Sequence, residues 1–176
     1  MKKYTYLIIC VVFLITVVSC ELSEKALCFD SRDGVLRMDK TADGWKYADK
    51  GKLNDEADIE LINVDETAYI MLMAEKKTDL SIDFNEYRNI IISNAENRYG
   101  IKLDSSSSVF VNENGLESYR YEFDVSQDTI NMRMYMYIAQ TKNYYVQVYA
   151  WTLRNNFDNM SDELNRTVLS LREVSR

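Results

Sequence analysis

Residues 119–136, YRYEFDVSQDTINMRMYM, decide the fold, because apolar or aromatic residues alternate with polar ones on both sides of a short polar break. Alternation with a period of two is typical of a β-strand that buries one face. With Gln127-Asp128 as a hairpin loop, Glu122 faces Arg133, and a slip by one residue would place charged side chains against methionines. The apolar face then pairs Val125 with Ile130, Phe123 with Met132, Tyr121 with Met134 and Tyr119 with Met136.

The strands around this hairpin continue it as an antiparallel meander over residues 105–154. Asn114-Gly115 predicts a type I′ turn, because both central positions of that turn need a positive φ. Residues 144–152, YYVQVYAWT, are apolar on both faces. This pattern is typical of a strand covered on both sides. The turn before it, around residues 141–143, is compatible with two registers.

Shorter β-rich runs precede the meander. A first strand is expected near residues 34–38, followed by Gly44-Trp45 and by an acidic loop at residues 54–58. Residues 59–64 and 67–74 are rich in β-formers and are separated by Asp65-Glu66, which predicts a hairpin.

Two helices complete the pattern. Asp83 can accept hydrogen bonds from the first turn of a helix over residues 84–99, and Gly100 can end it. Its predicted apolar stripe consists of Phe84, Tyr87, Ile91 and Ala95, with Arg98/Tyr99 at its end. Met160, Leu164, Val168 and Leu171 recur at the spacing of an amphipathic C-terminal helix whose stripe returns to the sheet.

Two helices and about six to seven mostly antiparallel strands predict an α+β sandwich. The order of these elements, with Gly44-Trp45 after the first strand, the runs at 59–74, the helix at 84–99 and the meander at 109–152, resembles the PsbP-like superfamily. This resemblance spans most of the chain after residue 33. It implies an accessory, docking or scaffold role in membrane complexes and brings no site residues with it.

The N-terminus carries an export signal. Lys2 and Lys3 precede an apolar run at residues 7–18, and Ser19-Cys20 ends it. This ending resembles the lipobox of bacterial lipoproteins, which implies cleavage between Ser19 and Cys20 and a lipid on the Cys20 sulfur. A helix of twelve residues spans about 18 Å, against about 30 Å of bilayer hydrocarbon. An ordinary cleaved signal and an uncleaved anchor remain alternatives.

The predicted organisation is therefore a signal peptide at residues 1–19, a lipidated tether at 20–33 and one domain at 34–176. We expect an extracytoplasmic protein held on a bacterial membrane by its N-terminal lipid. Cleavage removes Lys2 and Lys3 and no acidic residue, which moves the formal net charge from −7 to −9. Nucleic acid should repel such a domain.

The three cysteines are consistent with the predicted lipoprotein processing. If Cys10 leaves with the signal and Cys20 carries the lipid, as predicted, no other cysteine remains to form an intramolecular disulfide with Cys28. We expect Cys28 to remain a thiol, with an intermolecular disulfide as the alternative. A nucleophilic role is disfavoured, because the chain has no histidine to activate the thiol.

Catalytic signatures are missing from the sequence. The chain has no histidine, no proline and only five glycines, which leaves out histidine-based triads, common zinc sites and phosphate-binding glycine loops. Carboxylates in the loops, Asp55, Glu56 and Asp58 in one and Asp124 and Asp128 in another, are more typical of solvated turns than of a Ca²⁺ site. We therefore expect no cofactor, no metal and no enzymatic activity.

The thirteen tyrosines are the most suggestive feature of the mature chain. Most are expected in the core, and Tyr135 and Tyr137, opposite the methionine face, are the candidates for a partner surface. The predicted function is a non-enzymatic, lipid-anchored envelope protein that docks another envelope protein or complex. The alternative is a carrier or sensor of a small ligand, with a pocket between sheet and helix.

Overall fold

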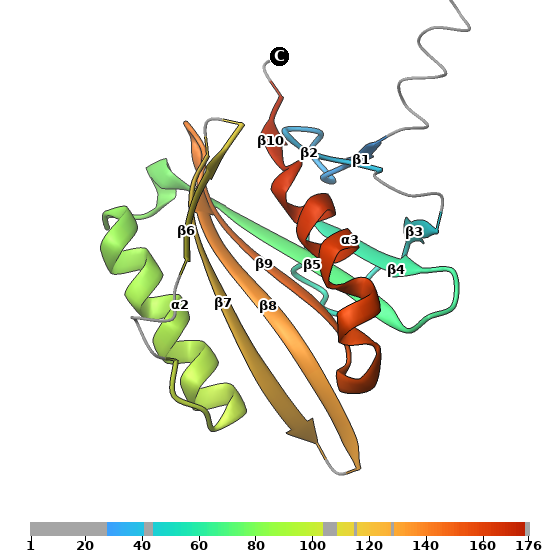
Figure 1. Cartoon of the computed structure of the whole chain (residues 1–176). Coiled ribbons are helices and arrows are strands. Elements are labelled where there is room, and N and C mark those ends of the chain that lie inside the picture. Colours follow the sequence, from blue (N-terminus) through green and yellow to red (C-terminus); the bar gives the residue numbers. More distant parts are fainter. Residues whose placement is uncertain (1–27, 41–43, 104–108, 115, 128, 175–176) are drawn as a thin grey trace, which may run out of the picture.

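Two antiparallel sheets and two long helices form the domain in this computed structural model (Figure 1), which describes residues 28–40, 44–103, 109–114, 116–127 and 129–174. Over these residues the larger sheet has seven strands in the order β3-β4-β5-β9-β8-β7-β6, and the smaller has the order β1-β2-β10. The strands are β1 (Cys28–Asp30), β2 (Leu36–Asp39), β3 (Trp45–Tyr47), β4 (Ile59–Asn63), β5 (Ala68–Lys76), β6 (Val109–Glu113), β7 (Leu116–Gln127), β8 (Ile130–Gln140), β9 (Tyr144–Leu153) and β10 (Arg172–Glu173). The predicted α+β class is confirmed.

Two predicted hairpins are present. β4 and β5 pair around Asp65-Glu66, and Glu66 takes the positive φ of 54° that the turn needs. β6 and β7 pair so that Glu113 faces Leu116, and Asn114 has a φ of 51°. Gly115 lies outside the described residues.

The hairpin of β7 and β8 forms, but its predicted register is wrong by two residues. Val125 pairs with Met132 instead of Ile130, and Tyr121 pairs with Met136. A register shift by an even number of residues keeps every side chain on its predicted face. The alternation of the sequence therefore determines the face of each residue but not its partner on the neighbouring strand. Glu122 faces Tyr135 and reaches Arg133 diagonally, with an ion pair of 2.5 Å.

β9 lies between β5 and β8 and is covered on both faces, as predicted. The sequence allowed two registers for the turn between β8 and β9. In the structure Thr141 faces Tyr144 across Lys142-Asn143, which decides between them. Thr141 N donates to Tyr144 O at 2.9 Å, and Tyr144 N donates to Thr141 Oγ1 at 3.0 Å.

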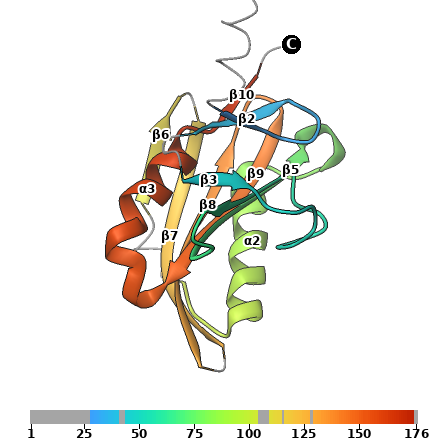
Figure 2. The same cartoon turned by 90° about the vertical axis from the view of Figure 1, so that its right-hand side faces the viewer.

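The helices α2 (Phe84–Tyr99) and α3 (Phe157–Leu169) cover opposite faces of the main sheet (Figures 1 and 2). The ends of α2 are as predicted, because Asp83 Oδ1 accepts from Glu86 N at 2.9 Å and Gly100 adopts a φ of 65°. Leu164 and Val168 of α3 are buried, as predicted. Leu171 is also buried, but it lies beyond the end of the helix. Two 3₁₀ turns, η1 (Lys77–Asp79) and η3 (Arg154–Asn156), join helices to strands.

The two faces of the main sheet have different compositions. On the α3 side the core is mostly aliphatic and small, with Ile70, Leu72, Val146, Val148 and Ala150. On the α2 side it is rich in methionine and aromatic residues: Met71, Met134, Met136, Tyr87, Tyr121, Phe123, Tyr145 and Tyr149. The odd-numbered residues of β9 face α2 and the even-numbered ones face α3.

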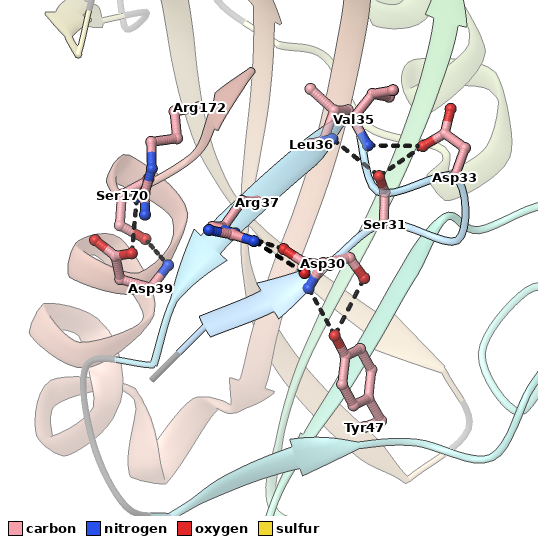
Figure 3. Close-up of polar contacts among 10 residues, drawn as sticks. All are labelled: Asp30, Ser31, Asp33, Val35, Leu36, Arg37, Asp39, Tyr47, Ser170 and Arg172. Carbon is pink, nitrogen blue, oxygen red and sulfur yellow. Dashed lines mark hydrogen bonds and ion pairs between the residues drawn. The ribbon is translucent and has the colours of Figure 1, made fainter. Parts of the chain in front are cut away.

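The smaller sheet corrects the predicted tether. β1 lies inside residues 20–33, pairs with β2 and buries Phe29, so the folded domain includes Cys28. Figure 3 shows its polar contacts, in which Arg37 binds Asp30 with two hydrogen bonds of 2.6 and 3.1 Å. β10, which the sequence pattern does not reveal, pairs with the other edge of β2.

Candidate functional site

An open apolar groove of about 350 Å³ lies at one end of the main sheet, on its α2 side. Its floor comes from three neighbouring strands and one loop: Tyr69 of β5, Trp151 and Leu153 of β9, Ile130 and Met132 of β8, and Leu53. Ile130 is 52% exposed and Leu153 40% exposed, so the groove opens to solvent. These two side chains also line an adjoining hollow of about 440 Å³ beside Arg154.

Aromatic stacking shapes the floor of the groove. Tyr69 pairs with Trp151 across β5 and β9, and their rings stack with centroids 5.3 Å apart and planes 17° apart. The Tyr69 hydroxyl donates to Glu66 O at 2.6 Å, which orients the ring. The result is a rigid aromatic surface next to the flexible Met132 side chain, a combination that suits apolar side chains of a partner.

The charged groups at the rim are engaged in ion pairs. Glu66 lies 3.3 Å from Lys52 and 3.7 Å from Lys46. The hydrogen bond from Lys52 and the charges of both lysines hold the pKa of Glu66 below its usual range. At the other side, Arg154 Nη1 binds both oxygens of Asp124 at 2.6 and 2.7 Å. The groove therefore presents an apolar floor between neutralised charges.

Tyr135 and Tyr137 are not part of a surface. They lie opposite the methionines, as predicted, but α3 covers them and leaves them 6% and 2% exposed. Burial raises the pKa of both hydroxyls. The Tyr137 hydroxyl donates to Asn165 of α3, and Tyr135 packs on Phe157 with ring centroids 5.0 Å apart. The prediction of a partner surface at these two residues is wrong, because a helix covers their face.

The acidic loop at residues 54–58 has a structural task. Asp58 Oδ2 accepts from Ala74 N at 2.8 Å, and burial raises the pKa of this carboxyl. Glu60, next to it in β4, accepts from the backbone N–H groups of Gly51, Leu53 and Asn54 at 2.7, 2.7 and 3.0 Å. Among the residues with a described placement, no cluster of three or more metal-ligating side chains occurs. Asp128, named above as a candidate carboxylate, lies outside the described residues.

Cys28 begins β1 and is half-buried. Burial raises the pKa of its thiol, which disfavours the reactive thiolate. Cys20 and Ser19 lie outside the described residues, so lipidation and cleavage there stay predictions. No helix among residues 28–174, gaps aside, is long and apolar enough to cross a bilayer.

Sequence reasoning missed the groove, although its residues carried a signal. Trp151 and Tyr69 are aromatic residues of β9 and β5 that stay half-buried. Ile130, next to a turn, is an apolar residue that is 52% exposed. Locating the groove required the order β5-β9-β8, which brings these residues together.

Comparison with known proteins identifies the fold and no more. No family model and no curated protein matches the sequence. Among solved structures, the cyanobacterial PsbP (CyanoP) of Synechocystis is similar with a TM-score of 0.60 at 8% identity, over 84% of this chain and 91% of that one. LpqN of Mycobacterium tuberculosis, described as involved in cell envelope biogenesis, has a TM-score of 0.59 at 10% identity, over 84% and 90%.

A protein of Bacteroides thetaiotaomicron is also similar, with a TM-score of 0.57 at 12% identity, and this chain spans about half of it, 48%. At such low identities the likeness concerns the fold. The chain has a PsbP-like α+β fold.

Proposed function

We propose that this protein is a lipid-anchored, extracytoplasmic accessory protein of a bacterial envelope, without catalytic activity, whose aromatic groove docks another envelope protein. The occupant of the groove is a segment of that partner with apolar side chains. The observation that carries the proposal is the stacked Tyr69–Trp151 floor beside exposed Ile130 and Leu153.

Three independent features support the proposed location in the envelope and the proposed lack of catalytic activity. Residues 1–20 have the order of a lipoprotein signal, with Cys20 at the predicted cleavage site. The fold is shared with PsbP and with a protein described as involved in cell envelope biogenesis. The sequence has no histidine, and the carboxylates of Asp58, Glu60 and Glu66 bind backbone amides or basic side chains.

The net charge of the chain indicates which charge the partner segment should carry. The mature chain has a formal net charge of −9, and exposed Asp55, Glu56 and Asp65 follow or precede groove residues in the sequence. Opposite charge accelerates encounter without adding much affinity. The acidic net charge of the mature chain therefore favours encounter with a partner segment that carries lysine or arginine beside its apolar side chains.

Site-specific photocrosslinking in the native host tests the docking. A photoreactive residue at Ile130, 52% exposed in the groove, is compared with one at Ile90, 44% exposed on α2 away from the groove. We expect one envelope protein to crosslink at position 130 and not at 90, and Trp151→Ala to reduce its yield at least about tenfold. Equal yields at both positions, or a yield unaffected by Trp151→Ala, would contradict the proposal.

Two controls accompany this experiment. Trp151→Phe keeps an aromatic ring on Tyr69 and should retain most of the crosslink, which separates loss of the floor from loss of fold. Intact-mass measurement of host-made protein should show cleavage before Cys20 and an added lipid mass. An unmodified Cys20 would overturn the lipid anchor while leaving the groove to be judged by crosslinking.

The small-ligand alternative has one observation in its favour. A volume of about 350 Å³ is near the lower end for small-molecule sites, about 300–1,000 Å³. The groove is, however, open at the strand ends instead of enclosed between sheet and helix. A carrier would keep an apolar molecule through purification, which native mass spectrometry of host-made protein would detect.

A further inference from the structure

We infer that the end of the domain that carries the smaller sheet faces the lipid bilayer, and that the groove is presented at the opposite end, away from the membrane. This inference rests on the proposed lipidation of Cys20. It assigns a membrane-facing surface to the β1-β2-β10 sheet and restricts where the docking partner can be.

The tether is short. β1 begins at Cys28, so only the seven residues 21–27 separate Cys20 from the folded domain. Fully extended, such a segment reaches at most about 25 Å, at about 3.5 Å per residue. The domain is therefore held closer to the bilayer than a tether of residues 20–33 would allow.

The turn that β10 contacts and the groove lie at opposite ends of β8. Glu173 of β10 accepts from Asn143 N, in the turn between β8 and β9, at 3.1 Å. From that turn β8 runs from Gln140 to Ile130 in the groove, and ten residue steps at about 3.3 Å separate these ends by about 33 Å. Figures 1 and 2 show β2 and β10 at one end of β8 and the β7–β8 hairpin tip at the other.

The attachment point cannot swing away from the domain. Phe29 is 5% exposed in the core, and Asp30 is held by Arg37 and by the Tyr47 hydroxyl, which accepts from Asp30 N at 2.6 Å. β10 is held to the same sheet, because Arg172 binds Asp39 at 2.7 Å (Figure 3). The tether therefore pulls on one fixed end of a rigid body.

Charge favours the same orientation. Residues 28–40, Lys142 and residues 172–173 include five basic and four acidic side chains, so this end is nearly neutral. Arg37–Asp30 and Arg172–Asp39 pair four of these charges within the sheet. The acidic excess lies on the rest of the mature chain, which anionic headgroups repel within about one Debye length, about 8–10 Å. Anionic headgroups therefore repel this nearly neutral end less than they repel the domain as a whole.

The orientation has a consequence for docking. A groove held at the far end of β8 meets the extramembranous part of a partner, and a transmembrane segment would not reach it. The bound segment should therefore belong to a soluble protein or to the extracytoplasmic portion of a membrane protein.

Energy transfer to the bilayer tests the orientation. Host-made, lipidated protein in the Cys28→Ser background is labelled with a donor at Lys142→Cys or at Ile130→Cys, then placed in vesicles of phosphatidylethanolamine and phosphatidylglycerol that contain an acceptor lipid. Both positions are exposed. We expect transfer from position 142 to exceed transfer from position 130 severalfold. Equal transfer, or more from position 130, would overturn the inference.

Two controls separate this inference from the proposed function. A glycine-serine insertion after residue 24 that about doubles the tether length should bring the two transfer efficiencies together, and an unchanged difference would contradict the tether argument. Vesicle co-sedimentation and intact mass report lipidation independently. Unlipidated protein that does not co-sediment contradicts the proposed anchor, whereas lipidated protein with the reversed order of transfer contradicts only the orientation.

Discussion

The two faces of the main sheet are covered in different ways, and the difference explains why the groove forms on one of them. α3 covers a face that is mostly aliphatic and small but includes Tyr135 and Tyr137, and side-chain hydrogen bonds join it to the sheet. α2 lies on methionine and aromatic side chains, and the groove floor at Tyr69 and Trp151 on the same side of the sheet stays half-buried. The first face fixes one packing arrangement, whereas the second leaves apolar surface available.

Hydrogen bonds hold α3 in place along its length. Asn165 Oδ1 accepts from Arg120 Nη1 at 3.0 Å and from the Tyr137 hydroxyl, and Glu163 accepts from the Trp45 indole N–H. Just past the helix, Ser170 Oγ accepts from Asp39 N at 2.8 Å. Such bonds between distant segments specify geometry in addition to burial.

α2 makes mostly stacking and apolar contacts. The Tyr87 ring stacks on Tyr145 at 4.7 Å, and Tyr99 packs near Phe123 at 5.7 Å. Methionine and aromatic side chains can fill irregular space by small rearrangements. Next to α2, the loop that precedes β4 (residues 48–58) covers the same face. The Glu60 carboxylate holds this loop by accepting hydrogen bonds from its backbone N–H groups.

The largest difference should appear when a core side chain is truncated under each helix. Leu164→Ala on α3, at a residue with 0% exposure, should cost about 4 kcal/mol of unfolding free energy. Ile91→Ala on α2, at 5% exposure, should cost about 2 kcal/mol, because methionines can move into the space. Urea unfolding of both variants measures the difference, and equal losses would remove the contrast between the faces.

The loop on the α2 side should depend on one carboxylate and on pH. Burial alone would raise the pKa of Glu60, but the hydrogen bonds from Asn54, Leu53 and Gly51 lower it overall. Glu60→Gln should cost about 2 kcal/mol near pH 7. A lowered folded pKa stabilises the fold above the unfolded pKa of about 4.3, and this stabilisation is lost as pH falls through the folded value.

The measurement is the unfolding free energy of both proteins between pH 7 and pH 3. The cost of Glu60→Gln should shrink on acidification, and a cost that stays constant would show that the charge is unimportant. Asp58→Asn is the matched control, because burial raises the pKa of Asp58. An amide oxygen can still accept from Ala74 N, so this variant should lose little stability at pH 7.

The smallest contrast concerns single hydroxyls on the two faces. Tyr137→Phe removes the donor to Asn165 on the α3 side and should cost about 1 kcal/mol. Tyr149→Phe on the α2 side should cost less, since this hydroxyl donates a long hydrogen bond, 3.5 Å to Gln147 Oε1. Burial raises the pKa of Tyr149 to about 12, so it is neutral during the measurement. A larger loss at Tyr149 would reverse the comparison.

Local patterns were sufficient for the two helices, for the longer strands and for the faces of β7 and β8. The period of two placed Tyr121, Phe123 and Met134 on one side of the sheet, and Asp83 and Gly100 marked the ends of α2. They were insufficient for the β7–β8 register, because a shift by two residues preserves the alternation. β10 was missed for a related reason: two residues are too few to show a period.

The candidate site shows the same division. The sequence identified aromatic strands, and it assigned the partner surface to Tyr135 and Tyr137 because the extent of a helix over a sheet is not a local property. The structure buries these two under α3 and instead exposes Ile130 and Leu153 beside Trp151. Which aromatic residues reach solvent depends on where each helix ends relative to the strands beneath it.

By itself the sequence determined the α+β class, the faces of the alternating residues in β7 and β8, the caps of α2 and the acidic charge, because these depend on residues close together in the chain. The tertiary structure alone decided the registers, the union of β10 with β2, and the groove. These features need contacts such as that of Asp39 with Ser170, 131 positions apart, and no local pattern records which distant segments will cover a given face.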